Sequence, residues 1–166
     1  MYEVIVLGLG AMGSAAAYHA ARRGQKVLGL DAHERGHKLG SSHGRSRIIR
    51  ESYAEGPQYV PLVQRAYELW GELEKESGRH LLTMTGGLYI GAPDSDIVTG
   101  VLRSAREHNL ACEYLAAGEV ASRFPGFRVP ESMVGVYEEN GGVLDADACI
   151  GAHLDMALRH GADLRH

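Results

Sequence analysis

Three glycines near the start of the chain have the spacing of a turn that binds the pyrophosphate of a dinucleotide. Residues 8–13 read G-L-G-A-M-G, which is the pattern G-x-G-x-x-G. In such a turn Gly8 permits the tight bend, Gly10 lets the backbone approach the phosphates, and Gly13 permits close packing of helix on strand. The N-terminus of a following helix would favour the negative charge. The residues that this pattern assigns to cofactor binding are Gly8, Gly10, Ala11, Met12 and Gly13.

Asp31 follows the turn at about the 20-residue spacing that dinucleotide-binding folds use for the ribose ligand. A carboxylate there accepts hydrogen bonds from a ribose diol and repels a 2′-phosphate, so NADP is disfavoured. We place the neighbouring Ala32 in the same site. FAD and NAD share the adenosine diphosphate half, so the turn and Asp31 leave both open.

The elements that must position these residues are a strand, a helix and a second strand. Residues 3–7 form a continuous apolar run, which favours a strand buried on both faces of a parallel sheet. Residues 11–23 are alanine-rich and end in two arginines, as a helix does before a capping glycine. With a strand over residues 26–31 they form one βαβ unit, so the predicted fold class is α/β with a Rossmann-like part.

A polar loop and a mixture of elements follow. Residues 32–47 lack periodicity and concentrate histidine, serine and glycine, which is typical of a functional loop. A loop of this kind after the second strand favours FAD, because simple nicotinamide domains usually alternate strands and helices with short loops. The pattern predicts helices over residues 57–77, 95–108, 118–124 and 145–160, and strands over residues 86–91, 133–138 and 162–165. Asp145 is the expected N-cap of the last helix, and Trp70 is expected in the core.

Short segments along the whole chain resemble one group of flavoenzymes. They read V-I-V-L-G-L-G-A-M-G-S-A-A-A-Y at residues 4–18, G-S-S-H-G at 40–44, R-I-I-R at 47–50, T-G-G-L at 85–88, R-F-P at 123–125 and G-V-L at 142–144. On these residues the chain resembles the monomeric sarcosine oxidase and N-methyltryptophan oxidase group of the FAD-dependent, D-amino-acid-oxidase-like family. The resemblance covers the N-terminal portion of the family's chain.

The resemblance implies FAD as the cofactor and assigns roles to the polar loop. Ser41, Ser42 and His43 would hydrogen-bond the phosphates, the ribityl chain or the ring edge, and Ile48 would also contact the cofactor. Arg47 would lie against the isoalloxazine as a fixed positive charge. These residues complete the predicted cofactor site.

The resemblance also implies a substrate site. Arg50 would pair with the substrate carboxylate through its guanidinium, so Arg47 and Arg50 are the predicted catalytic residues. Tyr53 and Glu55 would lie near the substrate entrance. At position 45 the resemblance leads us to expect an acidic residue, but the chain has Arg45. This change of charge would alter the electrostatic field near the flavin.

The implied architecture is a Rossmann-like FAD-binding part into which a mixed α+β substrate domain begins to be inserted. Residues 1–80 would belong to the FAD-binding part, residues 81–140 to a partial substrate domain, and residues 141–166 to a returning helix and strand. The implied reaction oxidises the C–N bond of sarcosine or another N-methyl amino acid with O₂, giving an aldehyde, a primary amino acid and hydrogen peroxide. Further substrate-binding residues would lie beyond His166, so we expect this truncated chain to lack turnover by itself.

Two other functions stay open on the residues alone. The first is an NAD-dependent dehydrogenase domain, which the glycine turn and Asp31 also fit. The second is a non-catalytic, nucleotide-binding subunit of a hetero-oligomeric amine oxidase.

Composition argues against several further classes. Lys and Arg number 17 against 21 Asp and Glu, for a net charge of −4, so there is no basic field for nucleic acid. No apolar run approaches the roughly 18 residues of a membrane span. Cys112 and Cys149 lie far apart in a chain without a recognisable signal peptide, so we expect a reduced cytoplasmic protein. The loop histidines have irregular spacing and no thiolate or carboxylate companion, so no metal is predicted.

The end of the chain carries an expectation about association. If residues 162–165 are a third parallel strand, the elements that should cover the sheet beyond it are absent, and uncovered parallel sheets are rare. We expect a monomeric parent enzyme. For this chain alone we expect an exposed apolar surface, with either self-association or weak stability.

Overall fold

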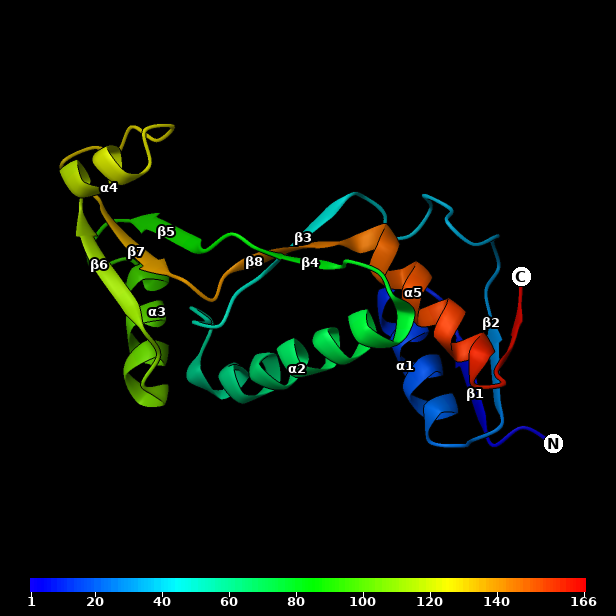
Figure 1. Cartoon of the computed structure of the whole chain (residues 1–166). Coiled ribbons are helices and arrows are strands. Elements are labelled where there is room, and N and C mark those ends of the chain that lie inside the picture. Colours follow the sequence, from blue (N-terminus) through cyan, green and yellow to red (C-terminus); the bar gives the residue numbers. More distant parts are fainter. The chain divides into compact units, whose positions relative to one another are not determined.

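A computed structural model describes all residues, 1–166, and divides them into two compact units. Unit 1 comprises residues 1–47, 69–82 and 144–166, and unit 2 comprises residues 48–68 and 83–143. Figure 1 shows the order of the elements along the chain. The chain passes from one unit to the other within β3 (Ser46–Ile49), α2 (Val60–Ser77), β4 (Leu82–Met84) and β8 (Gly142–Asp145).

Unit 1 is built on a parallel sheet of three strands. β1 (Val4–Leu7), β2 (Val27–Leu30) and β9 (Asp163–Arg165) lie in the order β1-β2-β9. α1 (Ala11–Arg22) connects β1 to β2, and α5 (Ala146–Arg159) leads into β9. Right-handed crossovers between parallel strands put both helices on one face of the sheet, and α1 and α5 lie side by side in Figure 1. The predicted βαβ unit and the predicted last strand are confirmed.

Small residues let α1 and α5 approach closely. Ala17 and Ala21 on α1 are at most 3% exposed, and Ala152 and Ala157 on α5 are fully buried. Alanine favours the helix and adds little bulk between two helices. The alanine-rich segment therefore forms both the helix and its packing face.

The opposite face of the sheet is not covered by any part of unit 1. Ile5 and Leu7 alternate with partly buried residues along β1 and are 60% and 80% exposed. The parallel register puts Leu28 and Leu30 of β2 on the same face. The prediction of a β1 strand buried on both faces is therefore wrong for this chain, because both crossover helices lie on the other face. The expected exposed apolar surface is present here.

Unit 2 contains an antiparallel sheet with short helices. β5 (Gly87–Gly91), β7 (Val134–Glu138) and β6 (Cys112–Ala116) lie in the order β5-β7-β6. The helical elements of this part of the chain are η1 (Pro57–Tyr59), α3 (Asp96–His108) and α4 (Ala117–Arg123). One side of the sheet packs against α3 in a core that contains Tyr89, Val98, Val101, Val134 and Val136.

All predicted helices are confirmed with their bounds shifted by a few residues, and Asp145 caps α5 by accepting a hydrogen bond from the Ala148 amide at 2.9 Å. Four short strands, β3, β4, β6 and β8, were not predicted from the sequence, and β3 begins inside the predicted loop 32–47. Short strands of this kind depend on partners that are distant in sequence, as β6 does on β7. Residues 48–68, which the sequence analysis put in segment 1–80, cluster with unit 2. None of the helices is long and apolar enough to cross a membrane.

Candidate functional site

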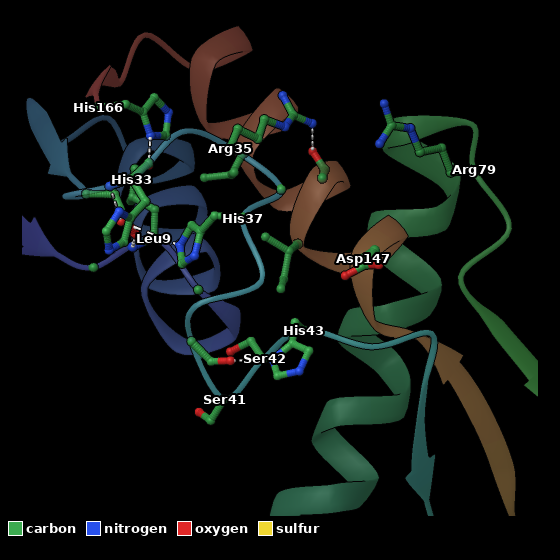
Figure 2. Close-up of a pocket in the computed structure, with 18 residues that line it drawn as sticks. Leu9, His33, Arg35, His37, Ser41, Ser42, His43, Arg79, Asp147 and His166 are labelled. Carbon is green, nitrogen blue, oxygen red and sulfur yellow. Dashed lines mark hydrogen bonds and ion pairs between the residues drawn. The ribbon is translucent and has the colours of Figure 1, made fainter.

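A cavity of about 430 Å³ opens in unit 1 beside the glycine turn. Its walls come from the turn after β1, from the loop after β2 and from the first half of α5, as Figure 2 shows. The lining residues include Gly8, Leu9, Gly10, Asp31, Ser41, Ser42 and His43 from the first two parts, and Asp147, Ile150, Gly151 and Leu154 from α5. Cavities of this size are typical of small-molecule and cofactor sites.

The geometry of the turn requires its glycines. Gly8 has a φ of 87°, a left-handed conformation that favours glycine. A Cβ on Gly13 would lie 1.7 Å from the carbonyl oxygen of Gly8, so no side chain fits there. A Cβ on Gly10 would lie 3.0 Å from Oγ of Ser42 and would narrow the space between the turn and the polar loop. The turn is thus shaped to keep backbone groups accessible.

The N-terminus of α1 is open toward an anion. Gly10 caps this helix without a side-chain hydrogen bond, and no acidic residue lies in the first turn. The Ala11 amide donates to Oγ of Ser42 at 3.1 Å, which ties the polar loop to the helix end. A helix N-terminus without an acidic side chain in its first turn suits the negative charge of a pyrophosphate.

Asp31 lies at the end of β2 as an ionised acceptor. Its Oδ2 accepts from the Leu9 amide at 2.7 Å, and its Oδ1 accepts from the His33 amide at 3.0 Å. The Leu9 hydrogen bond is the main reason that the pKa of Asp31 lies below its ordinary value. Each oxygen keeps a lone pair for a further donor, so the carboxylate can also bind a ribose diol.

Arg47 holds the polar loop together. Its Nη2 donates to the carbonyl oxygens of Ser41 at 2.9 Å and His43 at 3.0 Å, and its Nη1 donates to the carbonyl oxygen of Ser46 at 2.8 Å. The ring of His43 bonds the carbonyl oxygen of Gly40 at 2.5 Å. The guanidinium charge is therefore fixed next to the loop that lines the cavity.

Six of the twelve predicted cofactor residues line the cavity, and the other six are not among its lining residues. Gly8, Gly10, Asp31, Ser41, Ser42 and His43 line it, whereas Ala11, Met12, Gly13, Ala32, Arg47 and Ile48 do not. Gly13 packs against the backbone of the turn. Met12 is 88% exposed, and Ile48 belongs to unit 2.

The wall of the cavity formed by α5 and by Arg35 and Arg79 was not predicted from the sequence. Arg35 donates from Nη1 to Asp155 at 2.5 Å and from Nη2 to the carbonyl oxygen of Gly151 at 2.8 Å, which fastens the loop to α5. Arg79 also pairs with Asp155, and both arginines line the cavity (Figure 2). In the sequence, the position of Arg35 inside the polar loop was the one indication of this wall. The approach of α5 to the loop is a tertiary contact, which the sequence pattern does not show.

Arg50 has a different environment, in unit 2. Its Nη2 donates to both carboxylate oxygens of Glu55, at 2.7 and 3.0 Å. The guanidinium carbon lies 5.0 Å from the ring centre of Tyr53 and 5.9 Å from that of Tyr89. The Nε of Arg50 is buried and makes no hydrogen bond, so this side chain retains a donor for an additional acceptor.

Metal binding finds no support in the side-chain arrangement. No group of three or more His, Cys, Asp or Glu side chains converges in a way that could hold a metal ion. The rings of His33 and His37 have centres 4.9 Å apart and are tilted by 55°. Nε2 of His37 lies 3.6 Å from Oδ1 of Asp31, so one loop histidine does have a carboxylate neighbour, contrary to the sequence-based expectation. These histidines form part of the cavity wall.

A family model described as FAD dependent oxidoreductase matches residues 3–166, which is nearly the whole chain. The chain belongs to the FAD-dependent oxidoreductase family. FAD is the cofactor of this family, so it is favoured over NAD, the dinucleotide of the rival dehydrogenase interpretation. The predicted resemblance and the predicted α/β fold class are confirmed.

Individual relatives are amino acid oxidases. The chain is 48% identical over 163 residues to monomeric sarcosine oxidase of Streptomyces avermitilis, and 40% identical over 160 residues to N-methyl-L-tryptophan oxidase of Salmonella arizonae. A solved variant of NikD, an unusual amino acid oxidase essential for nikkomycin biosynthesis, is 30% identical with a TM-score of 0.87 over 99% of this chain. The chain spans only 42% of the first and third of these proteins and 43% of the second.

Proposed function

We propose that the cavity of unit 1 holds the adenosine diphosphate half of FAD. The observation that carries this proposal is the convergence of the glycine turn, the ionised Asp31 and the loop of Ser41 and Ser42 on one cavity. The N-terminus of α1 would bind the pyrophosphate, and Asp31 would accept from the ribose diol. The close approach of Ser42 to Gly10 leaves little room for a side chain on the turn, which supports a backbone contact with the phosphates.

We propose that the whole protein is an oxidase of secondary amino acids such as sarcosine or another N-methyl amino acid. Two relatives at 48% and 40% identity, named for sarcosine and N-methyl-L-tryptophan, support this substrate class. FAD, when bound, supplies the two-electron acceptor for oxidation of the C–N bond. The overall reaction consumes amine, O₂ and water and yields an aldehyde, a primary amino acid and hydrogen peroxide.

The residues of this chain would position the substrate and supply charge next to the cofactor. We propose that Arg50 binds the substrate carboxylate, which its unpaired Nε and its aromatic neighbours Tyr53 and Tyr89 support. Arg47 would supply a fixed positive charge beside the cofactor, and its three hydrogen bonds to loop carbonyls support a rigid position. Ile48 and Ala32 stay proposed cofactor contacts on the resemblance alone.

We also propose the organisation of the parent protein. Segments 1–80 and 141–166 would contribute to FAD binding, and segment 81–140 would begin the substrate domain. A cytoplasmic location agrees with the two free thiols, Cys112 and Cys149, and a monomer agrees with the similarity to monomeric sarcosine oxidase.

Binding of FAD can be tested on this chain alone. Titration of FAD with the chain should quench flavin fluorescence saturably. Asp31→Ala should raise the Kd for FAD about tenfold, because one acceptor for the ribose is lost. Glu34→Ala is the matched control, since Glu34 is an exposed carboxylate of the same loop that does not line the cavity. Equal FAD affinity for wild type and Asp31→Ala, or tighter competition by NAD than by ADP, would contradict the proposed site.

The substrate class requires the whole protein. Anaerobic addition of sarcosine should bleach its flavin spectrum, and admission of O₂ should restore the spectrum with release of hydrogen peroxide. An Arg50→Gln variant should raise the KM for sarcosine far more than the KM for an N-methylamine without a carboxylate. Flavin that stays oxidised with every N-methyl amino acid would overturn the substrate assignment.

A further inference from the structure

A second cavity, of about 280 Å³, lies in unit 2 and takes no part in the proposed function. It is lined by Glu51, Gln64, Tyr67, Met84 and Asn140. Glu51 is the only charged residue among the five, and no Lys, Arg or His lines the cavity. The site therefore presents a single negative charge.

Glu51 is held in the cavity wall by neutral groups. Glu51 is only 8% exposed. Oε1 accepts from Nε2 of Gln64 at 2.7 Å, and Oε2 accepts from Nδ2 of Asn140 at 2.8 Å. Buried carboxylates are usually paired with a cation, whereas this one has only amide donors and keeps lone pairs for two more hydrogen bonds.

The other walls also suit a positive ligand. Because the amide nitrogens of Gln64 and Asn140 donate to Glu51, their side-chain oxygens are left as acceptors. The hydroxyl of Tyr67 donates to the backbone carbonyl of Asn140, and burial followed by the charges of Glu138 and Glu51 raises the pKa of this phenol, so it stays protonated. The Tyr67 ring and the Met84 thioether are polarisable surfaces that attract methyl groups next to a positive nitrogen.

A second buried carboxylate strengthens the negative potential of this unit. Glu138 is 2% exposed and accepts from the Ser52 amide at 2.8 Å, the Glu51 amide at 3.2 Å and the Tyr89 hydroxyl at 2.8 Å. Arg50, which precedes Glu51 in the chain, is paired with Glu55. The balance of charge around Glu51 and Glu138 favours a cation.

We propose that this cavity binds an organic ammonium ion, a primary or N-methylated amine, with Glu51 as its charge partner. The ammonium N–H groups would donate to Glu51 and to the amide oxygens, and the carbon substituents would contact Tyr67 and Met84. The site is independent of FAD binding, so it can be tested without the cofactor.

The direct test is a titration of the ¹⁵N-labelled chain with methylammonium chloride, with sodium chloride at equal ionic strength as the reference. The side-chain NH₂ signals of Gln64 and Asn140 should shift saturably with methylammonium and not with sodium. Glu51→Gln should weaken this binding about tenfold or more, because it removes the charged acceptor. Glu131→Gln, at an exposed carboxylate of the same unit, should leave it unchanged.

A second pair of variants guards against misfolding of Glu51→Gln. Met84 is 49% exposed, so Met84→Lys can place the protein's own ammonium group in the cavity without disturbing the core. Met84→Lys should abolish methylammonium binding, and Met84→Leu should retain it. Shifts that never saturate, shifts that sodium reproduces, or unchanged binding in both Glu51→Gln and Met84→Lys would overturn the proposal.

Discussion

At the scale of single residues, the cofactor turn depends on the absence of side chains. Gly13 faces the carbonyl oxygen of Gly8 and the side chain of Val6, so α1 can start only if this position has no Cβ. Gly118 offers a contrast, because a Cβ there would meet no atom within 4 Å. Glycine is therefore required at position 13, where a side chain would clash, whereas position 118 has space for a side chain.

We expect Gly13→Ala to destabilise the chain by about 2–4 kcal/mol, since backbone must move to remove the contact. Gly118→Ala should instead be neutral or stabilise by up to about 1 kcal/mol, because alanine favours helix α4. Urea unfolding of both variants measures the difference. A Gly13→Ala variant as stable as wild type would show that the turn is looser than described.

At the scale of elements, three helical segments of unit 1 meet around aromatic and titratable groups. The imidazole of His153 on α5 lies 5.2 Å from Trp70 of α2 and 5.6 Å from Tyr18 of α1, measured between ring centres. His153 is 6% exposed, and the hydroxyl of Tyr18 donates to Glu76 at 2.5 Å. Trp70 thus packs between helices as the sequence predicted, although it is only half-buried.

This packing predicts an acid-sensitive unit 1. Burial, and then the nearby His19, lowers the pKa of His153 from 6.5 to about 4. Between these values the unfolded chain binds the proton and the folded chain does not, so stability falls as the pH decreases from 6.5 to 4, by up to roughly 3 kcal/mol.

The comparison is urea unfolding at pH 7 and pH 4.5 with His153→Phe, which keeps an aromatic ring without a titrating group. The variant should lose less stability on acidification than wild type, and His33→Gln, at an exposed histidine, should lose as much as wild type. An identical loss in wild type and His153→Phe would assign the acid sensitivity to other groups.

At the scale of the whole molecule, the parallel sheet of unit 1 has an exposed apolar face and two edge strands, β1 and β9. Ile5 and Leu7 are exposed on β1. Unpaired strand edges and apolar patches promote association between chains.

We therefore expect concentration-dependent self-association of this chain in sedimentation velocity. Leu7→Ser should weaken it about tenfold or more, because less apolar area is removed from water. Leu39→Ser is the matched control, since Leu39 is 75% exposed in the same unit but lies outside the sheet. A monodisperse monomer at every concentration, with a cooperative high-temperature melt, would contradict the prediction.

The glycine turn, Asp31, the βαβ unit and the family were all predictable from the amino-acid sequence, because they depend on local conformation and short spacing. The sequence could not determine the wall of the cavity where Arg35 and Arg79 meet Asp155 of α5, nor the cavity around Glu51, whose lining residues are spread from 51 to 140. The short strands were missed for the same reason. Contacts between distant segments follow from packing and strand register, and both are established only when the chain folds.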